Sequence, residues 1–481
     1  MGGGGEEGHE QTGRDFLLNR MDLAISQSAA ARRELRRILS ELDAVHTSSA
    51  WRWGLRIQRF RQEVIAGSWP ERWRYACHCV TRVLRLKAHS QEHLKPSWFE
   101  AGLEQWLGDV REAPSDWLFF IYANSGFIQE QRGHRLHRIA LELGRRGIPV
   151  FYSYYPWAPD EAVPKPTDPL LFQSPTWLTS QVMPQVARYQ FGRKNRVFLV
   201  GLPGAECVQA IGELSSLGWV THYDCMDDWQ EFRRAGAAPW YSAGAERMLA
   251  CSADVVTATA AVLVQKMQQY APDRLIHLSP NALDSSFLRP ELCGRIAPRT
   301  GRLIVGYVGH LGQWWFDWEG LKTVARSLPE AEFQIIGFGG PEKLELPANV
   351  RLLGARNHAQ IREIARRWRA ALIPFKLNPL SDAVDPLKVY EYLALGLPVV
   401  CFDMSQIRDY PYVYSASDPA SFADQIRHAA AAPMDRAVID SFLARNRWEN
   451  RVDQYLELAE TALATTSSVR GLQAAEELTS R

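Results

Sequence analysis

The chain has 481 residues, too many for one hydrophobic core, and this length predicts two to four domains. Its composition, 46% hydrophobic and 23% charged, is that of an ordinary globular protein, and a formal net charge of +1 excludes a protein built as a whole around nucleic acid. No apolar run approaches the ~20 residues of a membrane span, and residues 2–7 lack the basic and apolar parts of a signal peptide. We therefore expect a cytoplasmic protein.

The first part of the chain predicts a Gly-rich disordered leader over residues 1–14 and a helical extension over residues 15–112. Between residues 15 and 47, mostly apolar side chains recur at alternating spacings of four and three, as in a coiled coil. The members are Leu17, Met21, Ala24, Ser28, Ala31, Leu35, Ile38, Leu42 and Val45. The small central members fit an amphipathic helix packed on its own protein equally well, so a homo-oligomer through residues 15–47 is one of two open interpretations.

Residues 51–87 are basic and aromatic, with eight arginines and one lysine against two glutamates and with six interleaved aromatic residues. Each cation near an anionic leaflet adds ~1 kcal/mol of attraction, and tryptophan suits the headgroup region. We expect this segment to place the protein peripherally on the inner face of the cell membrane. A solvated helix packed on the catalytic domains is the alternative, and RNA binding is a weaker third interpretation.

From Trp117 the pattern becomes strand, turn and helix in repetition, which predicts parallel doubly wound sheets. We expect two Rossmann-like domains facing a cleft, at residues 113–295 and 296–445, followed by a crossover helix at 446–464 and a flexible tail at 465–481. The predicted strands are Leu118–Tyr122, Val150–Tyr154, Val197–Val200, Val220–Tyr223, Val255–Thr257 and Ile276–Leu278, then Leu303–Val308, Glu332–Ile336, Val350–Leu353, Ala371–Pro374 and Val399–Phe402.

The segment from Asp385 to Cys401 puts two charges on a helix that otherwise has a packing pattern. Lys388 and Glu391 are three residues apart and share one helix face, and Gly396 ends the helix before a buried strand. An ammonium and a carboxylate at this position suit a sugar nucleotide, the ammonium for the diphosphate and the carboxylate for the ribose hydroxyls. The alternative is a surface ion pair.

The run from Pro386 to Val400 resembles the donor-site signature of GT-B glycosyltransferases, specifically the large retaining group called family 4. Three further motifs follow the order that such enzymes use. They are His222–Trp229, Pro280–Asp284, and Gly306–Gly309 leading to Trp315–Trp318. The resemblance runs from about Trp117 to about Leu458. It implies an acceptor domain, a donor domain, and retaining transfer from a nucleotide-diphosphate sugar without a metal ion or other cofactor.

The residues beside the predicted coiled coil, 40–53, resemble a linker found in bacterial surface-polysaccharide glycosyltransferases. The implied acceptor is a lipid-linked or polymeric glycan, such as that of a lipopolysaccharide O-antigen or a capsule.

Donor-binding candidates follow strand ends, where ligands of parallel sheets bind. Two glycines, Gly309 and Gly337, allow the backbone to approach a diphosphate closely, and His310 is a candidate catalytic contact to phosphate or sugar, or else a turn histidine. The residues proposed to bind the donor are Gly309, Gly337, Lys376, Pro386, Leu387, Lys388 and Glu391. Lys376 and Lys388 are the candidates for stabilising the departing diphosphate, with a surface lysine as the alternative for each.

The chain departs from the family pattern at one position. Family 4 enzymes commonly carry two glutamates separated by seven residues, and the partner of Glu391 would fall at Ala383. Asp382 and Asp385 are neighbours without the required spacing. The usual contact with the donor sugar is therefore missing or rebuilt, which puts the retaining outcome in doubt.

Three carboxylates, Asp224, Asp227 and Asp228, end a predicted strand of the first domain. We assign Asp227 and Asp228 to acceptor binding or proton removal, with an acidic N-cap cluster as the alternative. No histidine or third ligand completes a metal site with Asp227 and Asp228, so we do not expect a metal ion to bind there. The acceptor-binding candidates are Asn124, Gln131, Arg132 and Asp224.

Two other functions compete with sugar transfer. A sugar-nucleotide epimerase or hydrolase can use the same fold. A catalytically inactive scaffold that retains the fold is the other, and Ala383 favours it.

Overall fold

The computed structural model describes residues 95–123, 125–129, 134–156, 161–284, 295–296, 300–341 and 343–479. Residues 95–481 form one compact unit. The predicted leader, the coiled coil of residues 15–47 and the basic segment of residues 51–87 lie outside the described residues. No helix in the described ranges is both long and apolar enough to cross a bilayer.

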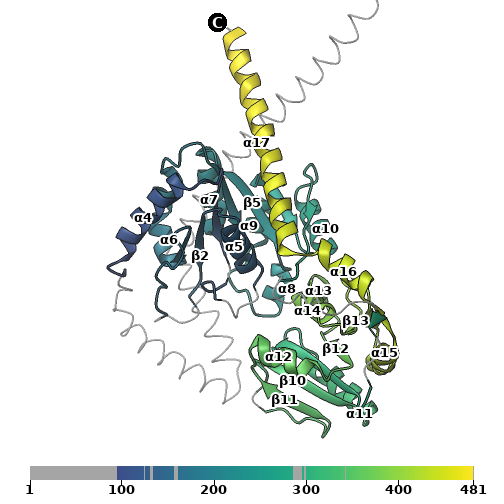
Figure 1. The fold of residues 1–481 in the computed structure, drawn as a ribbon. Coiled ribbons are helices and arrows are strands. Elements are labelled where there is room, and N and C mark those ends of the chain that lie inside the picture. Colours follow the sequence, from purple (N-terminus) through teal and green to yellow (C-terminus); the bar gives the residue numbers. More distant parts are fainter. Residues whose placement is uncertain are drawn as a thin grey trace, which may run out of the picture. The chain divides into compact units, whose positions relative to one another are not determined.

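The first sheet has seven parallel strands in the order β3-β2-β1-β4-β5-β6-β7 (Figure 1). They are β1 (Trp117–Tyr122), β2 (Val150–Tyr154), β3 (Leu171–Pro175), β4 (Asn195–Val200), β5 (Val220–Cys225), β6 (Val255–Ala258) and β7 (His277–Leu278). The helices of this domain are α4 (Phe99–Glu112), α5 (Arg135–Arg145), α6 (Thr176–Arg188), α7 (Ala205–Ser216), α8 (Trp229–Arg234), α9 (Ala243–Ser252) and α10 (Ala261–Tyr270). Helix α7 packs on α9, and α9 packs on α10.

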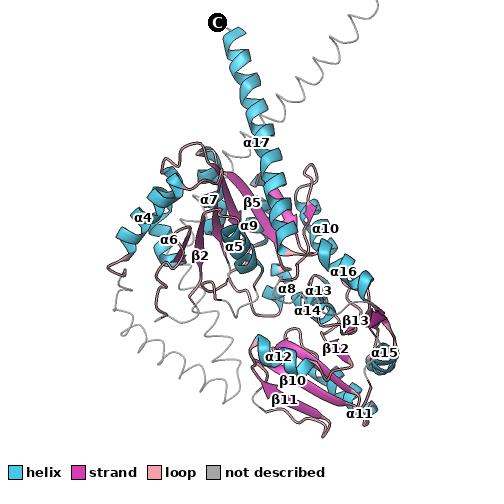
Figure 2. Cartoon of the chain, viewed as in Figure 1, coloured by secondary structure: helices cyan, strands magenta, loops and turns pink. Residues whose placement is uncertain are grey.

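The second sheet has six parallel strands in the order β11-β10-β9-β12-β13-β14 (Figure 2). They are β9 (Ile304–His310), β10 (Glu332–Phe338), β11 (Val350–Gly354), β12 (Ala370–Ile373), β13 (Val399–Phe402) and β14 (Val413–Ala416). The helices are α11 (Trp318–Ser327), α12 (His358–Ala365), α13 (Pro379–Asp382), α14 (Leu387–Ala394), α15 (Pro419–Ala431) and α16 (Arg436–Arg445). A short antiparallel pair joins β8 (Arg295–Ile296) to β15 (Met434–Asp435). Two doubly wound parallel sheets, as predicted, are confirmed.

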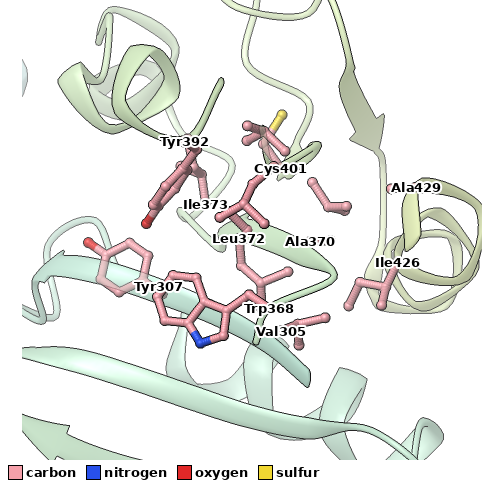
Figure 3. Close-up of a cluster of buried hydrophobic side chains, with 14 of the residues drawn as sticks. Val305, Tyr307, Trp368, Ala370, Leu372, Ile373, Tyr392, Cys401, Ile426 and Ala429 are labelled. Atoms are coloured by element: carbon pink, nitrogen blue, oxygen red, sulfur yellow. The ribbon is translucent and has the colours of Figure 1, made fainter. Parts of the chain in front are cut away.

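In the core of the second domain, the ring of Trp368 packs directly against the backbone of Gly306. Trp368 is fully buried, and a Cβ on Gly306 of β9 would lie 2.0 Å from its ring. The indole nitrogen of Trp368 donates to the side chain of Gln334 at 2.8 Å. Figure 3 shows Trp368 among Val305, Leu372 and Ile426. Dense packing of this kind fixes the positions of the strand ends that carry the polar loops.

Helix α17 (Trp448–Thr479) packs on α5 of the first domain. It extends past Ala464, where the sequence predicted a flexible tail to begin. Residues 465–479 contain no proline that would end the helix, and the helix continues through them although their threonine, serine, valine and glycine residues have low helix propensity.

In both sheets the winding direction reverses at one pair of adjacent strands, β1 and β4 in the first and β9 and β12 in the second. Loops that leave the carboxyl ends of such a pair diverge, which opens a crevice where ligands bind in doubly wound folds. In the second sheet, β9 ends at His310 and β12 is followed by Pro374, Phe375 and Lys376. Three of the predicted donor-site residues, Gly309, His310 and Lys376, therefore lie at this reversal point.

Candidate functional site

The loops after β9 and β10 approach each other through two glycines. Gly309 has φ 152° and Gly337 has φ 157°, and a Cβ on Gly337 would lie 1.8 Å from the carbonyl oxygen of Gly309. A Cβ on Gly309 would lie 3.1 Å from Cε of Lys388. Only glycine fits at both positions, so the backbone here can lie directly against a ligand and against the Lys388 side chain.

Lys388 is held over two aromatic rings at the start of α14. Its Nζ lies 5.5 Å from the ring centre of Tyr307 and 4.9 Å from that of Phe375. No described residue accepts a hydrogen bond from this ammonium or pairs with it as an ion. Burial lowers the pKa of Lys388 to about 8, against the opposing effect of Glu391. A desolvated ammonium whose three donors are unused is suited to an anionic ligand.

Glu391 lies one helical turn after Lys388 on the same face and is half-buried. Burial raises the pKa of Glu391 to about 7, with Lys388 and Arg138 opposing the rise and Asp284 adding to it. Arg138 and Asp284 form an ion pair of 2.5 Å that comes from the first domain. Within the described part of the chain, no group donates a hydrogen bond to the Glu391 carboxylate. A ligand that supplied hydroxyl donors would favour the ionised form of this carboxylate.

His310 is held as a neutral imidazole. The backbone N–H of Gly312 donates to its Nδ1 at 3.1 Å, which places the ring proton on Nε2. The ring stacks on Trp314 at 6.3 Å with an interplanar angle of 4° and meets the edge of Phe338 at 5.3 Å. Burial, and secondarily the charge of Lys388, lowers the pKa of His310. His310 therefore offers a hydrogen-bond donor without a charge.

Lys376 lines a pocket and donates to a neighbouring backbone carbonyl. Its Nζ donates to the carbonyl oxygen of Gln313 at 2.6 Å. It helps line a pocket of about 610 Å³ whose walls are Gln313, Phe316, Asp317, Trp318, Glu319, Lys322, Pro341, Lys343, Leu344, Glu345 and Lys376. Neither Lys388 nor Glu391 belongs to these walls. Lys376 is thus already engaged by the carbonyl oxygen of Gln313, whereas Lys388 has no hydrogen-bond acceptor among the described residues.

The N-terminus of α14 is fixed by an aspartate that was not among the candidates. Asp385 accepts hydrogen bonds from the backbone N–H of Asn281 at 2.5 Å and from the hydroxyls of Tyr390 at 2.8 Å and Tyr410 at 3.2 Å. Burial raises the pKa of Asp385 to about 6, although these hydrogen bonds oppose the rise. Pro386 is the N-cap residue and Leu387 the first helical residue, so both set the position of Lys388.

No aspartate replaces the glutamate missing at position 383. Ala383 is buried with 1% exposure at the end of α13. Asp382 accepts from the backbone N–H of Ser405 at 2.7 Å, and Asp385 is occupied by Asn281 and the two tyrosines. Both neighbouring carboxylates are therefore already engaged, Asp382 by the Ser405 backbone and Asp385 by Asn281 and two tyrosine hydroxyls.

Asp224 is buried in an ion pair with Arg135, which corrects its assignment to acceptor binding. Its side chain is fully buried and accepts from Arg135 at 2.7 and 3.3 Å and from Thr257 at 2.8 Å. Burial alone would raise the pKa of Asp224, but the charge and hydrogen bonds of Arg135 outweigh it and hold the pKa low. Arg135 also donates to Ser279, Asn281 and Tyr455, so the pair joins β5, the loop after β7 and α17.

The other two carboxylates of this loop differ from each other. Asp228 caps α8, accepting from two backbone N–H groups at 3.1 Å, and pairs with Lys266 at 2.8 Å. The carboxylate of Asp227 is half-buried and receives no hydrogen bond from the described residues. Burial raises the pKa of Asp227 to about 7, and the charges of Asp228 and Asp224 add to the rise. Asn124, Gln131 and Arg132 lie outside the described residues.

Residues 302–431 match the family described as glycosyl transferases group 1. The "Putative teichuronic acid biosynthesis glycosyltransferase TuaH" of Bacillus subtilis (strain 168) is 25% identical over 221 residues, covering 40% of this chain and 53% of that protein. The chain thus spans about half the length of this curated relative. Both similarities are to glycosyltransferases, the class of enzyme that the sequence motifs predicted.

Solved structures show the same fold. The α,α-trehalose 6-phosphate synthase of Burkholderia multivorans has a TM-score of 0.50 at 12% identity and covers 73% of this chain and 99% of its own. A structure described as trehalose-6-phosphate from E. coli bound with UDP-2-fluoro glucose also has a TM-score of 0.50, at 10% identity, and covers 71% and 99%. The predicted two-domain GT-B fold is therefore confirmed.

Proposed function

We propose that this protein transfers a sugar, with retention of configuration, from a nucleotide-diphosphate donor to a lipid-linked or polymeric glycan. The observation that carries the proposal is the pair Lys388 and Glu391. Both are charged groups without hydrogen-bond partners among the described residues, and both lie on one face of α14. Burying such groups costs free energy unless a ligand completes their hydrogen bonds.

The donor would lie between α14 and the loops after β9 and β10. Lys388 would bind the diphosphate, Glu391 would accept from ribose hydroxyls, and the backbone at Gly309 and Gly337 would lie against the phosphates. Negative charge grows on the diphosphate as it departs. Lys388 is placed to stabilise that charge, and the Nε2–H of His310 is placed to donate to it without adding a second positive charge beside the lysine.

The acceptor hydroxyl would lose its proton near Asp227. A carboxylate whose pKa lies near 7 is suited to general-base work at neutral pH, and Asp227 has that value. Asp228 and Lys266 would position this loop rather than react, because both are already engaged with each other and with the helix terminus. With Ala383 at the usual glutamate position, we propose attack of the acceptor on the same face that the diphosphate leaves.

The proposal also covers the chemical nature of the acceptor and the place in the cell where the protein acts. The description of TuaH as a teichuronic acid biosynthesis glycosyltransferase supports a polymeric or lipid-linked glycan. Residues 51–87 would hold the protein on the cytoplasmic face of an anionic membrane, and residues 15–47 would associate two copies.

A donor panel tests the proposal with the full chain. Nucleotide diphosphate sugars are incubated with and without membrane-extracted glycan, and released nucleotide is measured. We expect release from one donor that rises when glycan is added, and loss of that release in Glu391→Gln but not in Glu319→Gln, whose side chain is 82% exposed. Release that is indifferent to glycan would favour a hydrolase or epimerase. Nucleotide binding without any release would favour the inactive scaffold.

A further inference from the structure

A tryptophan on the loop between α8 and α9 is exposed although its loop is held firmly. Trp240 has 46% of its surface exposed. The backbone N–H of Ala237 donates to the carbonyl oxygen of Phe232 at 2.9 Å, and Arg233 donates to the carbonyl oxygen of Tyr241. The Tyr241 hydroxyl donates to Glu246 at 2.8 Å. The indole is thus presented to solvent by a fixed backbone.

Trp240 contacts the ring of Trp229, and the indole N–H of Trp229 has no hydrogen-bond acceptor among the described residues. The two ring centres are 5.3 Å apart with the planes tilted by 53°. Trp229 is only 6% exposed, and its indole N–H has no acceptor within the part of the chain that the structure describes. An unsatisfied buried donor costs about 1–3 kcal/mol, so a ligand oxygen that reached this N–H would be stabilised by that hydrogen bond. Trp229 follows Asp227 and Asp228 directly in the chain.

A chain of ring contacts leads from this tryptophan pair to the proposed donor site. Trp229 stacks on Phe232 at 5.5 Å, and Phe232 meets Trp315 edge-on at 4.9 Å. Trp315 stacks on Phe375 at 6.2 Å, the ring over which Lys388 lies. Four successive ring contacts therefore connect the exposed indole of Trp240 with Phe375, the ring that lies beneath Lys388.

We infer that Trp240 and Trp229 form a subsite for a sugar ring of the acceptor glycan. This inference rests on the proposed function. One face of a pyranose carries C–H groups that pack on an aromatic ring, while its hydroxyls need a few placed polar groups. Trp240 supplies the ring, the Trp229 N–H supplies a donor, and Asp227 supplies an acceptor with unused capacity.

The local charge favours a glycan over a membrane headgroup. Residues 227–242 contain three carboxylates, Asp227, Asp228 and Glu231, against the two guanidinium groups of Arg233 and Arg234. Arg234 pairs with Glu231, and Arg233 is used by its own loop. Anionic lipid recognition requires a surplus of cations, which this loop does not have.

The test compares full-length wild type with Trp240→Ala, Trp240→Phe and Leu275→Ala on an immobilised panel of pyranose oligosaccharides. Leu275 is 75% exposed on another loop of the same domain and serves as the matched control. We expect Trp240→Ala to weaken glycan retention about tenfold, Trp240→Phe to weaken it less, and Leu275→Ala to leave it unchanged.

Two further measurements separate the alternatives. Calorimetry with nucleoside diphosphates reports the proposed function on its own, since nucleotide binding does not involve Trp240. Wild type that binds nucleotide but retains no glycan, or Trp240→Ala that retains glycan as well as wild type, would overturn the subsite. Loss of sedimentation with phosphatidylglycerol vesicles in Trp240→Ala, with glycan retention intact, would overturn it in favour of membrane contact.

Discussion

The backbone N–H of Asn281 donates to the carboxylate of Asp385 at 2.5 Å, and the Asn281 side-chain amide donates to the carbonyl oxygen of Asp385 at 2.6 Å. This double contact ties the loop after β7 of the first domain to the residue that precedes α14. The helix that carries Lys388 and Glu391 is therefore positioned from the first domain as well as from its own sheet.

Removing the Asp385 carboxylate should destabilise the protein. Asp385→Ala leaves the Asn281 N–H and the hydroxyls of Tyr390 and Tyr410 without this acceptor, and we expect a loss of about 1–3 kcal/mol in the free energy of unfolding. Denaturant unfolding measures it, with the exposed Asp409→Ala as control. Equal stability of the two variants would remove Asp385 from this role.

The same residue should make stability depend on pH. Its pKa is about 6 in the folded protein and lies near 3.9 in an unfolded chain, so the folded state binds the proton more tightly. The stabilising contribution is fully present below about pH 4 and is lost as pH rises through 6. Asp385→Asn should remove this dependence between pH 4 and 6. A wild-type curve that rises relative to that of the variant over this range would contradict the assignment.

Arg135 and Asp224 should behave as a buried structural pair. Arg135→Met leaves a fully buried carboxylate without its partner, and we expect a loss of about 3–5 kcal/mol in the free energy of unfolding. The double variant Arg135→Met with Asp224→Leu should recover part of this loss, because no buried charge then remains. Thermal and denaturant unfolding of the two single variants, Arg135→Met and Asp224→Leu, and of the double variant measure the coupling. Additive effects would argue that the two side chains act independently.

A methyl group at position 337 should disrupt the proposed donor loop. In Gly337→Ala the new Cβ meets the carbonyl oxygen of Gly309 at 1.8 Å, so the loop must move, and we expect a cost of about 1–3 kcal/mol together with weaker nucleotide binding. Gly212→Ala in α7 is the control, because a Cβ there meets nothing within 4 Å. Alanine in a helix interior stabilises by about 0.5–1 kcal/mol. Unfolding curves should shift in opposite directions for the two variants, and calorimetry should show weaker nucleotide binding for Gly337→Ala alone.

The pH profile of kcat/KM should be bell-shaped. Asp227 and Glu391 must ionise, and both have a pKa of about 7, so activity should rise steeply through that pH. Lys388 must stay protonated, so activity should fall above its pKa of about 8. Lys388→Arg should extend activity to higher pH, since arginine does not deprotonate there. An unchanged alkaline limb in that variant would exclude Lys388 as its source.

Most of the fold followed from local pattern, and the prediction missed the short antiparallel pair β8 and β15 and, in the parallel sheets, β3 and β14. β3 and β14 are edge strands of their sheets, so each is covered on fewer sides. β3 is Leu-Phe-Gln-Ser-Pro, and its terminal proline suits an edge. By contrast β2 is buried along its whole length and was predicted with its observed bounds, Val150–Tyr154.

The candidate site could be predicted where its residues lie close together in the sequence. Spacing along one helix placed Lys388 and Glu391 together. It could not show that Asp224 is neutralised by Arg135, which lies 89 residues away in the sequence. It also grouped Lys376 with Lys388, although the loop after β12 sends Lys376 to Gln313. Asn281 and Asp385 did occur in the motifs, each beside a proline, but their contact joins positions 104 residues apart.

Calorimetric titration of the full chain with nucleoside diphosphates tests most directly whether Lys388 and Glu391 hold the donor. We expect wild type to bind one nucleoside diphosphate, and Lys388→Met and Glu391→Gln each to bind it at least about tenfold more weakly, a difference of about 1.4 kcal/mol. Glu319→Gln should bind as wild type does. Undiminished affinity in both Lys388→Met and Glu391→Gln, with their unfolding curves unchanged, would contradict the account.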